Sequence, residues 1–211
     1  MGEKNIKKIL LVEDGKKNRI AALKYFSKRK DLQVEAAMDY DQAMKGLKKK
    51  KFDGIITDIF MPEQTGTNKR MLGIQLYKKI YNTAYQKFEG LMQQANSGKK
   101  VDGWDVEHLD RVLNCCYKLS NAIFEDEANQ PLGLLIEEKA KELGIPCIPV
   151  TSLFHHNELA EPVFYYHDKV LGSYVLIQEG LMSSNGKEKN VKEDPKYWEE
   201  AYLKLEKLMK R

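Results

Sequence analysis

The sequence has few cysteines, no long apolar run and little excess of either charge. Its three cysteines, Cys115, Cys116 and Cys147, lack the spacing of metal ligands, so a reducing, cytoplasmic setting is expected. No apolar stretch approaches the roughly 20 residues of a membrane-spanning helix. The first apolar run, residues 9–12, is too short for a secretory signal. Basic residues number 35 against 31 acidic ones, which is weak support for nucleic-acid binding.

What the sequence does contain is an alternation of short aliphatic runs and helical patterns. The chain of 211 residues is 42% hydrophobic, enough for one domain with an elaboration. Residues 8–12, 33–37 and 55–59 have the composition of buried strands. Residues 18–29 and the segment after Asp39 or Asp41, either of which can cap a helix, carry apolar side chains at helical spacing. This order predicts a parallel sheet with right-handed crossovers.

The alternation is interrupted after Pro62 by two long amphipathic patterns. Residues 71–95 repeat apolar side chains at three and four positions, and a second pattern follows a possible cap at Asp105. A polar break at residues 97–103 separates them. The two patterns predict a helical hairpin within residues 64–130.

The strand and helix alternation resumes after the hairpin. A helix is expected at residues 132–143, closed by Gly144, then a strand at 146–150 and a fifth strand at 163–166. Residues 171–181 fit either an extra strand or the start of a helix. Residues 183–194 are expected to be a polar linker, and Asp194 to cap a final helix at 195–211 that begins with Pro195 and packs on or beside the main domain. The predicted fold is α/β: a doubly wound, flavodoxin-like parallel sheet of five strands in residues 1–182, with the helical hairpin inserted.

Three acidic residues lie at the carboxyl ends of predicted strands. Glu13 and Asp14 end the first strand, and Asp58 ends the third. In an open parallel sheet, ligands bind outside the carboxyl ends of the strands, so neighbouring strands would bring the three carboxylates together. Such a cluster repels itself and needs protons or a hard cation, typically Mg²⁺. The simpler alternative is that these acids are strand-end caps.

Four segments of the sequence together resemble response-regulator receiver domains. They are Glu13-Asp14, Asp58-Ile-Phe-Met-Pro62, Thr151-Ser152 and Tyr166-His-Asp-Lys169. The resemblance covers residues 6–62 and about 131–169, while the hairpin and the tail lie outside it.

The resemblance implies a role for each matched residue. Asp58 would be the phosphoacceptor, its new negative charge met by a metal, a hydroxyl and an ammonium. The implied Mg²⁺ ligands are Glu13, Asp14, Asp58 and the backbone carbonyl of Phe60. The implied phosphoryl contacts are Thr151 and Lys169, and the switch residues are Thr151 and Tyr166.

The resemblance also implies a function and partners. The chain would be a cytoplasmic phosphorylation-dependent switch of two-component type, with at most self-phosphorylation and autodephosphorylation as activity. A sensor histidine kinase or phosphotransfer protein would supply the phosphoryl group, in a phosphorelay or directly. No DNA-binding domain is evident, so a downstream protein target would be reached through protein contacts, with the hairpin at 64–130 as one candidate surface.

Two other functions remain open on the sequence. A degenerate pseudo-receiver would keep the fold as a protein-binding scaffold without phosphoryl transfer. It is favoured by the hairpin and by Val170, which follows Lys169 where the family usually has proline. A flavodoxin-like nucleotide or flavin binder would need a phosphate-cradling loop after the first strand, and residues 13–18 instead begin with two acids.

Overall fold

The computed structural model describes residues 6–151, 157–172, 176–177 and 190–210. The first half contains β1 (Lys7–Val12), α1 (Lys16–Phe26), β2 (Leu32–Ala37), α2 (Tyr40–Lys49), β3 (Gly54–Asp58), α3 (Met71–Asn96) and α4 (Gly103–Glu125). The second half contains η1 (Glu127–Asn129), α5 (Gly133–Glu142), β4 (Cys147–Thr151), α6 (Ala160–Tyr166), η2 (His167–Leu171), β5 (Leu176–Ile177), η3 (Val191–Glu193) and α7 (Pro195–Met209).

The strands form one parallel sheet in the order β2-β1-β3-β4-β5, in which β5 is a two-residue edge strand. The predicted α/β architecture with a parallel sheet is therefore confirmed, and it is consistent with a receiver fold. The register pairs Val12 of β1 with Thr57 of β3. The residues that follow these two positions therefore emerge side by side at the carboxyl edge of the sheet.

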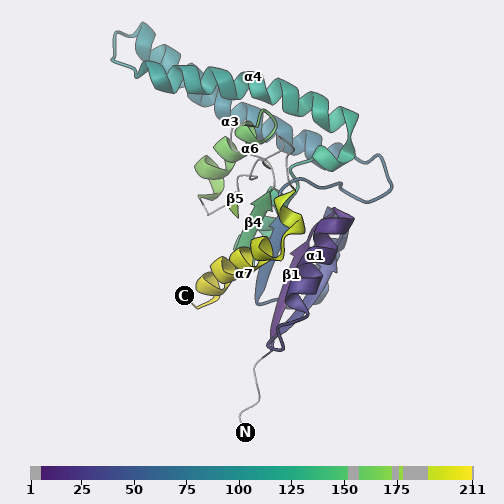
Figure 1. The fold of residues 1–211 in the computed structure, drawn as a ribbon. Coiled ribbons are helices and arrows are strands. Elements are labelled where there is room, and N and C mark those ends of the chain that lie inside the picture. The colour runs from purple at the N-terminus through teal and green to yellow at the C-terminus, as the bar shows by residue number, and fades with distance from the viewer. Residues whose placement is uncertain (1–5, 152–156, 173–175, 178–189, 211) are drawn as a thin grey trace, which may run out of the picture.

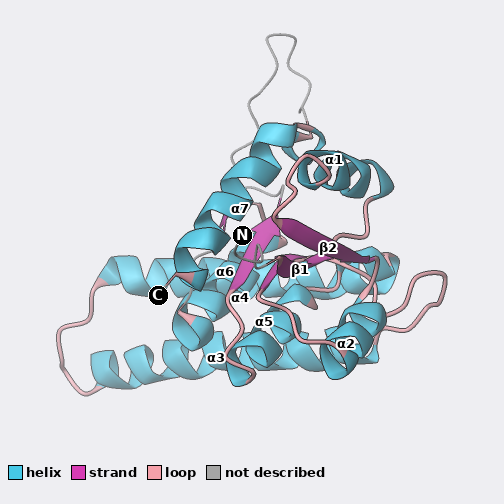
Figure 2. Cartoon of the chain, turned by 90° about the horizontal axis from the view of Figure 1, so that it is seen from below, coloured by secondary structure: helices cyan, strands magenta, loops and turns pink. Residues whose placement is uncertain are grey.

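Helices cover both faces of the sheet (Figure 2). Successive residues of a strand point to opposite faces, and β1 shows this directly. Ile9 and Leu11 pack in a buried cluster with α1 and α7, whereas Leu10 and Val12 pack in another with α2 and α5. The continuous apolar runs of β1 and β3 are explained by this burial on both sides.

Helices α3 and α4 lie side by side as a hairpin across the end of the sheet toward which the strands run, with α6 beneath them (Figure 1). The N-cap of α4 is Asp102, whose carboxylate accepts a hydrogen bond from the Trp104 backbone N–H, rather than the expected Asp105. The two long helices are as the sequence predicts.

The strand predicted at residues 163–166 is wrong, because these residues belong to α6. Their β-branched and aromatic composition favours a strand, but the folded segment is helical and all of its residues except Phe164 are buried, so no alternating pattern of burial distinguishes it. Pro162 lies in the first turn of α6, where proline costs no hydrogen bond. The segment 171–181, which fitted either a strand or a helix, contains β5 among its described residues.

Two helix ends are as expected. Gly144 has a left-handed backbone with φ of 67°, as its position after α5 predicts. Asp194 caps α7, with its carboxylate accepting from Lys196 N, and Pro195 is the first helical residue. The helix itself is not peripheral, because Tyr197, Trp198 and other side chains of α7 are fully buried against the sheet.

Candidate functional site

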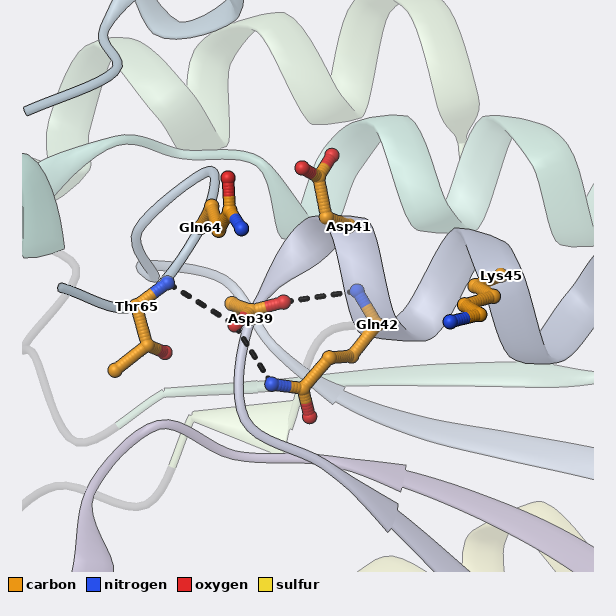
Figure 3. A pocket seen from close by; sticks show the side chains of 6 residues that line it. All are labelled: Asp39, Asp41, Gln42, Lys45, Gln64 and Thr65. Atoms are coloured by element: carbon orange, nitrogen blue, oxygen red, sulfur yellow. Dashed lines mark hydrogen bonds between the residues drawn. The ribbon is translucent and has the colours of Figure 1, made fainter. Parts of the chain in front are cut away.

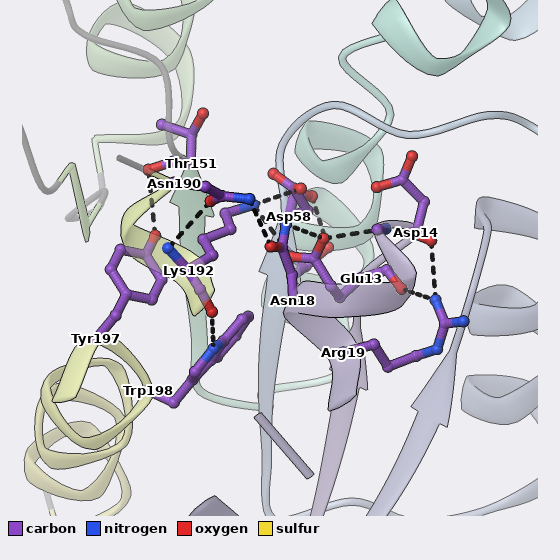
Figure 4. Close-up of polar contacts among 12 residues, drawn as sticks. Glu13, Asp14, Asn18, Arg19, Asp58, Thr151, Asn190, Lys192, Tyr197 and Trp198 are labelled. Carbon is purple, nitrogen blue, oxygen red and sulfur yellow. Dashed lines mark hydrogen bonds and ion pairs between the residues drawn. The ribbon is translucent and has the colours of Figure 1, made fainter. Parts of the chain in front are cut away.

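The carboxylates of Glu13, Asp14 and Asp58 meet at the carboxyl edge of the sheet (Figure 4). One oxygen from each lies within 4.8 Å of the others. Glu13 is 0% exposed and Asp58 is 7% exposed, while Asp14 is partly exposed. The adjacency of β1 and β3 thus brings together residues that are far apart in sequence.

The start of α1 holds the first two acids in place. Glu13 Oε1 accepts hydrogen bonds from the Gly15 backbone N–H at 3.1 Å and from Asn18 Nδ2 at 3.0 Å. The guanidinium Nη1 of Arg19 donates to the carbonyls of Glu13 and Asp14 at 2.8 and 2.9 Å. The turn between β1 and α1 is therefore shaped by hydrogen bonds that also orient the acidic pair.

The buried cation of the site is Lys192. Its Nζ donates to Glu13 Oε2 at 3.1 Å and forms an ion pair with Asp58 Oδ2, and its side chain is 1% exposed. Trp198 Nε1 donates to the Lys192 carbonyl at 2.7 Å. Asn190 accepts from Lys192 N at 3.2 Å and donates to Asn18 Oδ1 at 2.8 Å. The segment that carries Lys192 is thus anchored to both α7 and α1.

Lys192 comes from residues 183–194, which the sequence led us to interpret as a linker. Residues 183–189 lie outside the described part of the chain, but residues 190–194 are built into the site rather than linking it to something else. The signal that could have identified Lys192 is its position two residues before Asp194, which begins the last helix together with Pro195. Its neighbours in sequence are polar, so the segment as a whole was interpreted as a linker.

The structure does not bring Lys169 to Asp58. Lys169 lies in η2 on the surface, with Nζ 5.9 Å from the centroid of the Tyr165 ring. The Tyr166-x-x-Lys169 spacing matches the family motif in a strand, whereas here it falls in helical structure. Helical geometry turns the lysine away from the sheet edge.

The remaining predicted residues have mixed positions. Thr151 ends β4, is 1% exposed, and its carbonyl accepts a hydrogen bond from Tyr197 OH at 3.1 Å. Tyr166 instead packs against α5, where its OH donates to Glu138 Oε1 at 3.4 Å. Phe60 is nearly buried, in a cluster with hairpin and α6 residues. Among the predicted residues, Thr151 lies at the same sheet edge as the acids, and Tyr166 does not.

The electrostatics of the site are unbalanced, because one ammonium faces three carboxylates. Burial raises the pKa of Asp58 well above its ordinary value, with Glu13 and Asp14 adding to the rise and Lys192 opposing it. Burial, followed by the charge of Glu13, raises the pKa of Asp14 to about 6. Burial alone would lower the pKa of Lys192, but Asp58 and Glu13 raise it on balance. The site therefore favours an ionised lysine and has capacity for a further cation.

The donor set fits a hard divalent cation such as Mg²⁺. All three side chains offer carboxylate oxygens, which are the ligands that Mg²⁺ prefers. Asp14 is the most exposed of the three, so it is the carboxylate that solvent can reach. The excess of negative charge and the close spacing of the oxygens are what such an ion needs.

Helix α5 begins against the backbone of Asp58. The Gly133 N–H donates to the Ile59 carbonyl at 2.9 Å, and a Cβ on Gly133 would lie 2.1 Å from the Asp58 carbonyl oxygen. A Cβ atom cannot lie so close to this oxygen unless the backbone of Asp58 moves. Glycine is therefore required at this position by a close approach, and sequence patterns give no sign of it.

A second polar pocket lies beside the start of α2 and is lined in part by Asp39, Asp41, Lys45 and Gln64 (Figure 3). Asp39 is 1% exposed, and its oxygens accept from Gln42 N at 2.8 Å, Gln42 Nε2 at 2.9 Å and Thr65 N at 3.0 Å. These bonds cap α2 and fasten the loop after β3. The buried acid is thus explained by the fold.

Comparison with known proteins gives one family. Residues 9–87 match the model of the response regulator receiver domain, and the match ends within α3. No curated protein and no solved structure matches the chain. Receiver domains act in two-component signalling with histidine kinases or phosphotransfer proteins. In the described part of the chain, no helix is both long and apolar enough to span a membrane. Residues 9–87, the part of the chain that contains Glu13, Asp14 and Asp58, are therefore similar to the response regulator receiver domain.

Proposed function

We propose that the protein is a phosphorylation-dependent switch that accepts a phosphoryl group on Asp58. The observation that carries this proposal is the arrangement of Asp58 with two further carboxylates and the Lys192 ammonium at the carboxyl edge of the sheet. An acidic pocket that a single ammonium only partly neutralises is costly unless a ligand makes use of it.

Glu13, Asp14 and Asp58 are the side chains that would hold Mg²⁺, with the backbone carbonyl of Phe60 as a further proposed ligand. When bound, the ion supplies positive charge that offsets the phosphoryl oxygens. The ionised Asp58 oxygen attacks the phosphorus of the donor, forming an O–P bond while the bond from phosphorus to the donor breaks. The donor atom leaves with the bonding electron pair.

Lys192 takes the role that the resemblance assigned to Lys169. Its ammonium already contacts Asp58, so it is placed to pair with a phosphoryl oxygen once the carboxylate is phosphorylated. Thr151 at the end of β4 is the hydroxyl donor that we propose for another oxygen. Both groups belong to segments tied to α7, since Tyr197 bonds to the Thr151 carbonyl and Trp198 to the Lys192 carbonyl.

We further propose that the phosphoryl donor is a sensor histidine kinase or a phosphotransfer protein, and that the chain acts in the cytoplasm. The fold supports a doubly wound receiver sheet of five strands in which α3 and α4 are an insertion after β3. Output then passes through protein contacts rather than through DNA binding.

A degenerate receiver that acts only as a scaffold is the second candidate. It is favoured by the position of Lys192, which already partly neutralises the pocket and fills it with a fully buried side chain. A scaffold of this kind binds its partner equally well after Asp58→Asn. A phosphorylation switch loses its regulated binding in the same variant.

The deciding experiment is incubation with acetyl phosphate and Mg²⁺, followed by intact mass measurement. We expect one phosphoryl adduct in the native protein, none in Asp58→Asn, and a normal amount in Lys169→Ala. Lys192→Ala is expected to change the yield or lifetime of the adduct by about tenfold or more, since a charge-assisted contact is worth roughly 1.5–3 kcal/mol. Absence of an adduct in the native protein, or its persistence in Asp58→Asn, contradicts the proposal.

A further inference from the structure

A single buried cluster connects the acceptor strand, the hairpin and α6. Ile59 and Phe60, the two residues directly after Asp58, belong to it. The hairpin and α6 supply most of its other members, among them Leu76, Ile80, Leu119, Ile123, Val163 and Tyr166. Close-packed interiors transmit a displacement rather than absorb it. The hairpin is therefore joined to the acceptor site by packing.

A buried carboxylate adds a polar joint between α6 and α4. Glu161 of α6 has a side chain only 9% exposed, and its Oε1 accepts from Arg111 Nε and ion-pairs with Arg111 Nη2, both at 2.6 Å. Cys115 Sγ lies 3.6 Å from Oε2, and His108 Nδ1 lies 3.9 Å from Oε1. Three residues of α4, one turn apart, thus converge on one acid of α6.

The polar joint extends to the beginning of α4. The ring of Trp104 stacks on His108 with centroids 5.2 Å apart and planes within 8°, and His108 lies 6.0 Å from the Tyr165 ring of α6. Trp104 is 67% exposed. A change in how Glu161 engages α4 would therefore alter the surroundings of Trp104.

Helix α6 is also fastened on its acceptor side. His167, at its C-terminal end, is fully buried with Nε2 3.1 Å from Glu137 Oε2 of α5. Helix α5 is the one that begins with Gly133 against the Asp58 carbonyl. The acceptor backbone, α5, α6 and the hairpin therefore form a continuous series of contacts.

We propose that the α3–α4 hairpin is the part of the chain that responds to the state of Asp58, and that Glu161 is the positioning residue that couples it to α6. This inference rests on the proposed function. Phosphorylation adds close to two negative charges beside Lys192 and Thr151. The resulting shift of Ile59, Phe60 and α6 reaches α4 through the buried cluster and the Glu161–Arg111 pair.

The two tryptophans of the chain allow both ends of this route to be observed at once. Trp198 bonds to the Lys192 carbonyl and reports the acceptor site, whereas Trp104 reports the hairpin. The protein is labelled with 5-fluorotryptophan, and the two ¹⁹F resonances are assigned with Trp104→Phe. Spectra are then recorded before and after addition of Mg²⁺ and beryllofluoride.

We expect both resonances to shift in the native protein. In Glu161→Gln, and in Arg111→Gln as a second variant that alters the exposed partner, the Trp198 shift remains and the Trp104 shift is lost. Glu158→Gln is the matched control, because Glu158 pairs with Lys118 of the same helix α4 in an exposed position, and it retains both shifts.

The other possible outcomes exclude the response of the hairpin, the role of Glu161 or the proposed function itself. A Trp198 shift without a Trp104 shift in the native protein excludes the response of the hairpin. A Trp104 shift that survives in both Glu161→Gln and Arg111→Gln excludes the coupling role of Glu161. Absence of any Trp198 shift, together with no acetyl phosphate adduct, overturns the proposed function itself.

Discussion

In the described part of the chain, the acidic site at the sheet edge and the acidic site between α4 and α6 differ in their charge balance. At the sheet edge, three carboxylates face the single ammonium of Lys192. Between α4 and α6, the single carboxylate of Glu161 faces Arg111, with His108 and Cys115 beside it. The site at the sheet edge therefore has more carboxylates than cations, whereas at the site between α4 and α6 the one carboxylate is matched by one guanidinium. The excess negative charge supports the proposed role of the sheet-edge site in binding a cation and a phosphoryl group, whereas the Glu161–Arg111 pair joins α6 to α4.

The largest effect is expected from removing the ammonium of the first site. Lys192→Met leaves three carboxylates without their buried partner and should lower the free energy of unfolding by about 3–5 kcal/mol. Lys169→Met, on the surface, should change it by less than about 0.5 kcal/mol. Urea unfolding at pH 7 measures both, and similar losses in the two variants would show that Lys192 is not the cation of the site.

A backbone change beside the same site should have the next largest effect. Gly133→Ala places a Cβ against the Asp58 carbonyl and is expected to cost about 1–3 kcal/mol of unfolding free energy. Gly90→Ala is the matched control in α3, where no atom lies within 4 Å of the added Cβ, and it should stabilise the protein by about 0.5–1 kcal/mol. Equal effects of the two substitutions would contradict the close approach of α5 to Asp58.

The excess of negative charge at the sheet edge should make the stability of the protein depend on pH. The Asp14 pKa is raised from 3.8 to about 6, so the favourable contribution of its protonated form is present below pH 4 and is lost as pH rises through 6. Asp14→Asn should therefore stabilise the protein by about 2 kcal/mol at pH 7.5 and by little at pH 4. Thermal unfolding across this range checks the prediction, and a pH-independent effect would refute it.

Addition of Mg²⁺ should stabilise the native protein through the sheet-edge site and not through the Glu161 site. At 100 times its dissociation constant, the ion should stabilise the protein by about 2.7 kcal/mol at pH 7.5, and less below pH 6 where Asp14 is protonated. Asp14→Asn should reduce this gain, and Glu161→Gln should leave it unchanged. Melting temperatures with and without Mg²⁺ provide the measurement, and an equal Mg²⁺ gain in both variants would exclude Asp14 as a ligand.

The smallest change in the free energy of unfolding is expected at the site between α4 and α6, where Glu161 pairs with Arg111. Glu161→Gln keeps the shape of the side chain and a hydrogen-bonding group, so it should cost about 1–2 kcal/mol. Glu158→Gln breaks only an exposed ion pair and should cost less than about 0.5 kcal/mol. Urea unfolding compares the two, and a loss at Glu158 equal to that at Glu161 would show that burial does not distinguish these pairs.

Much of the fold could be predicted from the sequence because its signals are local. Continuous apolar runs indicated β1 and β3, apolar spacing indicated α3 and α4, and Asp194-Pro195 indicated the start of α7. Residues 163–166 were mispredicted because their composition favours a strand, whereas in the folded chain they belong to α6, which is buried on nearly all sides. Composition over four residues cannot distinguish these cases.

By itself, the sequence determined which carboxylates gather, because Glu13, Asp14 and Asp58 each lie at the carboxyl end of an apolar strand and parallel strands end at one edge of the sheet. Only the tertiary structure decided which cation meets them. Lys192 reaches Glu13 from 179 positions away, carried there by the packing of α7 and by Trp198 and Asn190. A local motif favoured Lys169, but helical structure directs that side chain to the surface. Contacts between distant segments depend on how the whole core packs, and short sequence patterns do not contain that information.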